Sequence, residues 1–140
     1  MSMYFIGIDI SKYKHDCCII SAANQKVVSK VIIKNNKAGF NELLTIIHSL
    51  ANPADIRIGF ESTAHYALNL ELFLENSLLT FMEVNPVLIS EYKKSKTLRR
   101  TKTDSVDCES IARWLMTVEY KPHSKGFYHA YSLKSLTRLR

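Results

Sequence analysis

The sequence lacks a long run of apolar residues, because its hydrophobic stretches are short and interrupted by charges. Its N-terminus also lacks the order of basic, apolar and small residues that marks a secretory signal. A membrane-spanning helix needs about 20 consecutive, mostly apolar residues. These absences argue against a membrane span and against export, so we expect a soluble, cytoplasmic protein with no membrane partner.

Cysteine, histidine and glycine are present, but in patterns that argue against several kinds of site. The three cysteines and five histidines show no spacing typical of zinc ligands. Cys17 and Cys18 are neighbours on a predicted strand, so their side chains point to opposite faces, and we expect reduced, buried thiols. The four glycines are widely spread. This argues against the glycine-rich turns with which sugar kinases and related ATPases approach nucleotide phosphates.

Length and composition predict one compact domain with a polyanionic partner. A chain of 140 residues with 46% hydrophobic and 23% charged residues is long enough to bury a core. The net charge of +6 can be assigned to one stretch without acids, whose basic residues are Lys93, Lys94, Lys96, Arg99, Arg100 and Lys102. Such a run suits DNA or RNA, because neutralised phosphates release condensed counterions. The alternative is a solvated basic face.

Hydrophobic periodicity predicts three consecutive strands followed by alternating helices and strands. The predicted strands cover 4–10, 15–22, 26–34, 55–61 and 78–84. The first helix begins near Asn36 or Asn41 and ends before Pro53, a second covers roughly 64–76, and Pro86 opens a third. An antiparallel meander followed by right-handed crossovers gives a mixed five-stranded sheet with helices on both faces. This α/β arrangement is ribonuclease H-like.

Two acids end strands of this predicted sheet, and two more open the helix that follows the basic run. Asp9 lies near the end of the first strand, and Glu61 ends the fourth. In "KTDSVDCESIARWL", residues 102–115, Asp104 and Asp107 fall on or beside the apolar stripe, where we expect them to face the sheet. A structural alternative is an acidic capping box, with Asp104 as N-cap and Asp107 at the third helical position.

The order of these four acids, D...E...D-x-x-D, predicts a metal site. In open α/β sheets, sites form beyond the carboxyl ends of the strands. Four converging acids repel one another unless cations lie between them. Oxygen ligands suit Mg²⁺, and two such ions can activate an attacking oxygen and stabilise a departing one in phosphodiester chemistry. We therefore expect two Mg²⁺ or Mn²⁺ ions at Asp9, Glu61, Asp104 and Asp107.

Four segments carry a resemblance to a known family, namely "GIDISK" at 7–12, "FESTAHY" at 60–66, "NPVLISEYKKSKTLRRTKTDSVDCESIA" at 85–112 and "LTRLR" at the end. Over essentially its whole length, the chain resembles the N-terminal domain of the DEDD-type insertion-sequence transposases, which are RuvC-like recombinases. The resemblance implies a magnesium-dependent site that cleaves and exchanges DNA strands, with the same four acids matched residue by residue. Two departures, Ala64 for glycine and Cys108 for alanine, replace none of the acids.

The same resemblance implies further partners and a missing part. Family members use a bridge RNA as a guide to pair donor and target DNA, and a C-terminal domain supplies a nucleophilic serine. We therefore expect residues 1–119 to form the RuvC-like DEDD catalytic domain. Residues 120–140 are expected to form a loop and the start of a truncated helix that leads to the missing domain. The isolated chain is then expected to be inactive, and the full-length protein to be a homo-oligomer.

Several other residues admit both a functional and a structural interpretation. Lys12 and Lys14 follow the first strand closely enough to steer a phosphate, or else they are solvated loop lysines. Tyr92, among lysines, can stack on a base, although packing of its own helix is the simpler interpretation. His65 is expected to be structural, and Ser62 is expected to cap a helix.

Two alternatives to a transposase stay open at this point. One is a non-catalytic module that binds RNA or DNA through residues 93–102, with the acids acting as helix caps and as ligands of a structural ion. The other is a Holliday-junction-resolvase-like nuclease.

Overall fold

The computed structural model of the chain describes residues 3–61, 65–96 and 106–122. Within them, a five-stranded sheet has the order β3-β2-β1-β4-β5. Its strands are β1 (Tyr4–Ile10), β2 (Lys14–Ser21), β3 (Val27–Lys34), β4 (Ile56–Phe60) and β5 (Met82–Glu83). The first three strands form an antiparallel meander, whereas β4 runs parallel to β1 and β5 runs parallel to β4. The sheet is therefore mixed, as predicted.

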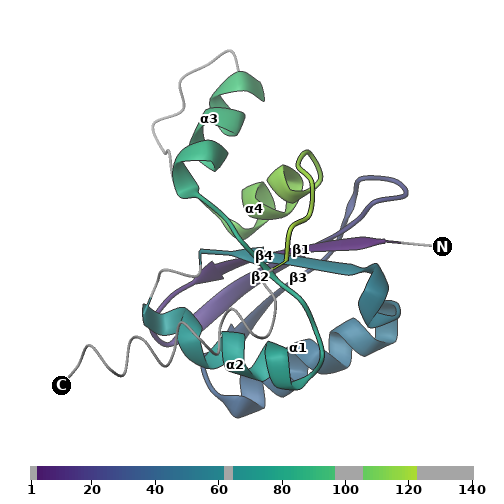
Figure 1. Cartoon of the computed structure of the whole chain (residues 1–140), viewed down its shortest axis with the longest axis vertical. Coiled ribbons are helices and arrows are strands. Elements are labelled where there is room, and N and C mark those ends of the chain that lie inside the picture. The colour runs from purple at the N-terminus through teal and green to yellow at the C-terminus, as the bar shows by residue number, and fades with distance from the viewer. Residues whose placement is uncertain (1–2, 62–64, 97–105, 123–140) are drawn as a thin grey trace.

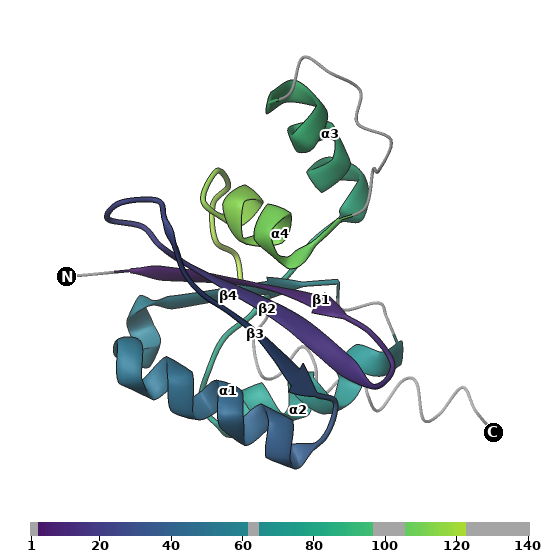
Figure 2. The ribbon, with the colours of Figure 1, turned by 180° about the vertical axis from the view of Figure 1, so that it is seen from behind.

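Helices cover both faces of this sheet, as Figure 1 and Figure 2 show from opposite sides. One face carries α1 (Lys37–Leu50) and α2 (Leu68–Asn76), and the other carries α4 (Cys108–Leu115), on which α3 (Pro86–Lys96) packs. Two short 3-10 turns, η1 (Pro53–Asp55) and η2 (His65–Ala67), precede β4 and α2. The fold is the predicted ribonuclease H-like α/β arrangement.

Alternation along β1 decides which side chains meet which helices, because successive residues of a strand point to opposite faces. Ile6 and Ile8 are fully buried in the apolar cluster under α1 and α2. Gly7 faces α4, whose backbone lies directly over it. Asp9, two residues further on, therefore projects on the α4 face at the end of the strand. One face of β1 therefore contributes to the hydrophobic core, and the other face carries Asp9 at its carboxyl end.

The first helix begins at the earlier of its two predicted starts. The Asn36 side chain accepts a hydrogen bond from the Gly39 backbone N–H at 2.9 Å, which satisfies one of the open donors of the first turn. Its buried side includes Phe40, Leu43 and Ile47. These residues join the same cluster as Ile8. A cap and a helical apolar stripe together therefore determine where α1 starts and which side it buries.

The fifth strand is shorter than its apolar sequence predicts, covering Met82–Glu83 instead of 78–84. Leu78 adopts a positive φ of 60°, and the Leu79 N–H donates to the Leu74 carbonyl oxygen, so this part of the run closes α2. Leu79 and Phe81 are buried. The apolar residues before the strand therefore end a helix and fill the core, which leaves two residues for the sheet ladder. In contrast, β2, β3 and β4 agree with their predicted ranges within one residue at each end.

Candidate active site

Two glycines bring α4 unusually close to the middle of the sheet. A Cβ atom on Gly7 would overlap the Cys108 carbonyl oxygen and lie 2.5 Å from the Ala112 backbone nitrogen. A Cβ atom on Gly59 would lie 2.7 Å from the Leu115 side chain. Because glycine has no side chain, the helix backbone rests on β1 at Gly7. This contact holds the N-terminal end of α4 near the carboxyl end of β1.

Asp9 and Glu61 occupy matching positions on two neighbouring parallel strands. Gly7 of β1 pairs with Gly59 of β4. Asp9 and Glu61 each follow two residues later, so both lie at the carboxyl end of these parallel strands. Asp9 is half-buried, whereas Glu61 is exposed just beyond the last residue of β4.

Asp107 is the N-cap of α4, which differs from the capping box considered above. Its carboxylate accepts a hydrogen bond from the Ser110 N–H at 2.7 Å, and the Ser110 hydroxyl accepts one from the Asp107 N–H at 3.0 Å. The third helical position is therefore Ser110, and the helix starts one residue after Asp107. Asp107 is exposed at the helix end instead of lying beneath the apolar stripe. The bond to Ser110 uses Oδ1, so the cap does not occupy Oδ2.

A fifth acid, Asp16, was missed in the sequence. It pairs directly with Asp9 across the antiparallel β1–β2 ladder. Directly opposed residues of such a ladder point to the same face, so both carboxylates lie on the α4 side. Strands predicted at 4–10 and 15–22, joined by a short turn, contain the signal for this pairing. A register argument applied to them places Asp9 within about one residue of Asp16.

The electrostatics of Asp9 reflect this gathering of acids. Burial raises the pKa of its carboxyl group above the usual value of 3.8, and the negative charges of Asp16, Asp107 and Glu61 raise it further, in that order. Three elements, β2, α4 and the end of β4, therefore direct acids toward one side chain of β1. Within residues 3–61, 65–96 and 106–122, no three potential metal ligands lie close enough to form a complete site.

Several predicted site residues lie outside the described residues, namely Asp104, Arg99, Arg100 and Lys102. Lys93 and Lys94 lie on α3, and Lys96 is its last residue. The basic run therefore starts on a helix that packs on α4. Lys12 lies in the turn between β1 and β2, with its ammonium 5.1 Å from the centre of the Tyr13 ring.

The remaining sequence predictions concern packing. All three cysteines are buried free thiols, as expected for Cys17 and Cys18. Tyr92 is partly buried in the cluster between α3 and α4, in agreement with the packing interpretation. The His65 ring stands edge-on to Tyr66. Ser62 lies outside the described residues, so its predicted cap stays a prediction.

A search for a membrane-spanning helix and for a cavity adds little to the site. Among the described helices, none is both long and apolar enough to cross a membrane. A cavity of about 440 Å³ lies at the opposite end of β1, lined by Tyr4, Asp55 and residues 48–52. Its lining contains none of the predicted site residues.

Comparison with known proteins shows the family to which the chain is related. Residues 6–140 match the model of the DEDD transposase family of IS110. The chain is also similar to the pilin gene-inverting proteins of Moraxella bovis and Moraxella lacunata, with 33% identity over 115 residues in each case. These matches cover 81% of this chain and 34% of each relative. The chain thus spans about a third of the length of the curated relatives that it matches.

Proposed function

Because the chain belongs to the DEDD transposase family of IS110, we propose that it forms the catalytic part of a DNA recombinase. In this proposal, Asp9, Glu61, Asp104 and Asp107 form the site at which phosphodiester bonds are cleaved and exchanged. The observation that supports the proposal most directly is geometric: Asp9 and Glu61 each follow the paired Gly7 and Gly59 by two residues, and α4, with Asp107 as its N-cap, packs on Gly7. Burial and the nearby acids also raise the pKa of Asp9, and ionisable groups perturbed in this way are typical of functional sites.

Two divalent cations, Mg²⁺ or Mn²⁺, are the proposed cofactors. The donor set is entirely carboxylate oxygen, which is what hard cations of this kind prefer. When bound, such cations activate the attacking oxygen and stabilise the departing one. Asp9 and Glu61 would hold them from neighbouring strands, and Asp107 would do so from the start of α4. Asp104, which lies outside the described residues, is the fourth proposed ligand. Asp16, which lies beside Asp9, adds negative charge that a bound cation would offset.

The chain's own contribution is to keep these carboxylates in position before substrate arrives. Asp9 is fixed by its ladder with β2, and Asp107 is fixed by its hydrogen bonds with Ser110. In Asp107 the two roles are compatible, because Oδ1 caps the helix and Oδ2 can bind a cation. The close contact of α4 with Gly7 then sets the separation of the helix end from β1.

DNA is the proposed substrate, and residues beyond the acids are proposed to bind it. Lys12 and the basic run of Lys93, Lys94, Lys96, Arg99, Arg100 and Lys102 would contact the phosphate backbone, which neutralises charge without reading sequence. Residues 1–119 would form the catalytic domain, and 120–140 would lead toward a C-terminal domain with the nucleophilic serine. A guide RNA and a homo-oligomer of the full-length protein complete the proposal.

A binding experiment tests the metal site directly. Calorimetric titration of the 140-residue chain with MnCl₂ is expected to show binding that becomes at least about tenfold weaker in Asp9→Asn, because a charged ligand is lost. Asp104→Asn should behave in the same way. Glu42→Gln is the matched control, since it removes an exposed carboxylate from α1 on the opposite face. Unchanged affinity in both aspartate variants would contradict the proposed site.

A second candidate is a non-catalytic module that binds nucleic acid. The observation that favours it is the structural role of Asp107, since a helix cap explains this carboxylate without any cation. If the acids of this module act only as helix caps, Mn²⁺ affinity should be equal in the wild type and in Asp9→Asn, so the same titration separates that form of the module from the proposed catalytic site.

A further inference from the structure

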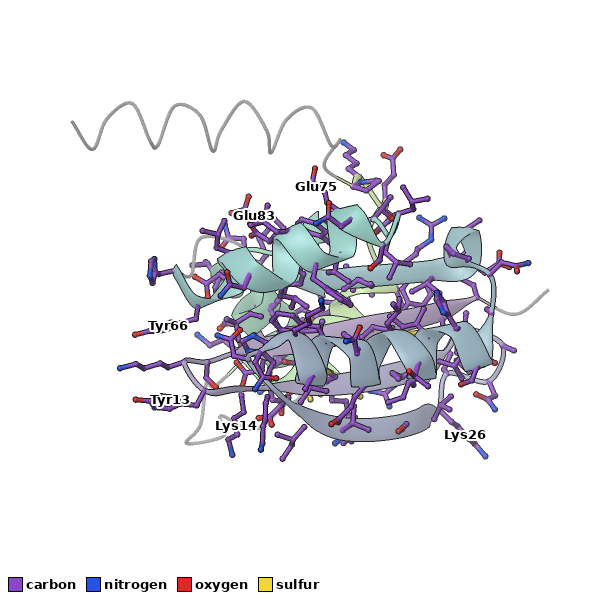
Figure 3. The ribbon with its side chains drawn as sticks, turned by 90° about the horizontal axis from the view of Figure 1, so that it is seen from below. Tyr13, Lys14, Lys26, Tyr66, Glu75 and Glu83 are labelled. Carbon is purple, nitrogen blue, oxygen red and sulfur yellow. The ribbon has the colours of Figure 1, made fainter. Side chains whose placement is uncertain are left out.

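Two exposed tyrosines lie at the end of the sheet where the acids gather. Tyr13, in the β1–β2 turn, is 76% exposed, and Tyr66, in η2, is 41% exposed. Figure 3 shows both side chains at the same end of the molecule, with Lys14 nearby and Lys26 at the opposite end. Large aromatic rings are normally placed in a core, where they bury a large area. Two such rings at one exposed end therefore suggest a ligand.

Asn35 ties the two tyrosine-bearing segments together. Its backbone N–H donates to the Tyr13 carbonyl oxygen at 2.9 Å. Its side-chain amide donates to the Lys12 carbonyl oxygen at 3.0 Å and to the Tyr66 carbonyl oxygen at 3.3 Å. Segments more than 50 residues apart in the sequence thus share one hydrogen-bonding residue. The backbones that carry the two rings are held in a fixed relation, which is what a preorganised binding surface needs.

The charges around these rings match a polyanion. The Lys12 ammonium lies 5.1 Å from the centre of the Tyr13 ring, over one of its faces. Lys14 pairs with Lys34 across the β2–β3 ladder, and both are exposed. An aromatic face beside several cations is the arrangement by which proteins bind unpaired nucleotides, with stacking for the base and cations for the phosphate. A fully paired duplex hides its base faces and cannot use the rings in this way.

The rings also lie within reach of the acids. Tyr13 follows Asp9 by four residues, and Tyr66 follows Glu61 by five. Four residues of extended chain span at most about 14 Å, and the turn between the paired residues Ile10 and His15 shortens this reach. A strand whose phosphate lies at Asp9 is therefore close enough to contact Tyr13 within a few nucleotides.

We propose that Tyr13 and Tyr66, positioned by Asn35 and flanked by Lys12, stack on unpaired bases of the DNA strand that reaches the acidic site. The inference rests on the proposed function, because it assumes that this strand is held at the acids. It adds that the strand must be locally unpaired beside the site. The surface therefore selects single-stranded or opened DNA over an intact duplex.

Fluorescence of 2-aminopurine tests this stacking. A short single-stranded DNA with 2-aminopurine near its middle is mixed with the 140-residue chain, with Ca²⁺ in place of Mg²⁺ to slow cleavage. Binding is expected to quench the base fluorescence, and a matched duplex is expected to bind more weakly. Tyr13→Leu and Tyr66→Leu should each weaken single-strand binding by about tenfold and reduce quenching. Tyr13→Phe should retain both, because a phenyl ring still stacks.

Two controls separate stacking from general charge effects. Lys26→Ala, at the far end of the sheet, should leave binding unchanged. The double variant Arg99→Ala/Arg100→Ala should weaken single-strand and duplex binding alike and reduce the salt dependence. Unchanged quenching in both leucine variants, together with Mn²⁺ binding that requires Asp9, would overturn the stacking surface and leave the proposed function intact. Tighter binding of duplex than of single strand by the wild type would also overturn it.

Discussion

The two faces of the sheet are built on different principles. Under α1 and α2, large apolar side chains such as Ile8, Phe40 and Phe60 fill the space between helix and strand. Under α4, the strands contribute Gly7 and Gly59, so the helix approaches the backbone itself. The first face gains stability from buried area. On the second face, the glycines bury less apolar area, but they let the backbone of α4 approach the strands closely. This close approach brings Asp107 toward Asp9.

The face under α1 and α2 nevertheless carries one group that opposes its stability. Glu71 of α2 is only 5% exposed, and within the described residues its Oε1 atom has no hydrogen-bond partner. Burial raises the pKa of its carboxyl group to about 7, and the charges of Glu83 and Glu75 contribute further. The acids on the other face come from several elements, whereas Glu71 is a buried residue of one helix, α2. The acids on the α4 face thus lie at the partly exposed end of the sheet, whereas Glu71 lies within the hydrophobic core.

The largest effect is expected from closing the space under α4. In Gly7→Ala, the new methyl group meets backbone atoms of Cys108 and Ala112, which cannot move without displacing the helix. The free energy of unfolding should fall by more than about 3 kcal/mol. In Gly59→Ala, the methyl group meets the flexible Leu115 side chain, so the loss should be about 1 kcal/mol. Urea denaturation of both variants measures the difference.

Equal losses in the two glycine variants would contradict this account, because they would show that close backbone contact is not special to Gly7. Titration of Gly59→Ala with Mn²⁺ gives a second test. Since the Leu115 side chain can adjust to the new methyl group, the Mn²⁺ affinity of this variant should stay near that of the wild type.

An intermediate effect is expected at Glu71. A raised pKa means that the folded state holds this proton more tightly than the unfolded state, so wild-type stability falls as pH rises from about 4.5 to about 7. Glu71→Gln should therefore be more stable than the wild type by about 3 kcal/mol near pH 8, with the difference vanishing near pH 4. Thermal denaturation across this range measures it. Glu42→Gln, which is exposed on α1, should show no comparable change. A pH-independent gain in Glu71→Gln would refute the role of ionisation.

The smallest effect on stability is expected at the start of α4, where capping and charge can be separated. Ser110→Ala removes one half of the capping box and should cost about 1 kcal/mol, with Mn²⁺ affinity retained. Asp107→Asn keeps an oxygen that can cap the helix, so its stability should change by less than about 0.5 kcal/mol. Its Mn²⁺ affinity should nevertheless fall by at least about tenfold. If Asp107→Asn binds Mn²⁺ like the wild type, Asp107 is a cap and nothing more.

Much of the fold was accessible from local pattern, and the misses have identifiable causes. The strands β1 to β4 and the position of Glu61 after β4 follow from alternation and apolar runs, which act within a few residues. The run at 78–84 was overestimated as a strand, because apolar residues serve a helix end and a core as well as a sheet. Asp16 was missed because its importance lies in a register with Asp9. Asn35 was missed because its partners lie on other segments.

By itself, the sequence determined where most of the strands lie, where the acids stand along the chain, and that basic residues precede the last helix. These features depend on neighbours a few positions apart, so periodicity carries them. Tertiary structure decided that β4 lies beside β1, that α4 rests on Gly7, and that Tyr13 and Tyr66 share Asn35. Such contacts join residues far apart in the chain, and they form because burying both faces of one sheet outweighs the entropy of closing the long loops between them.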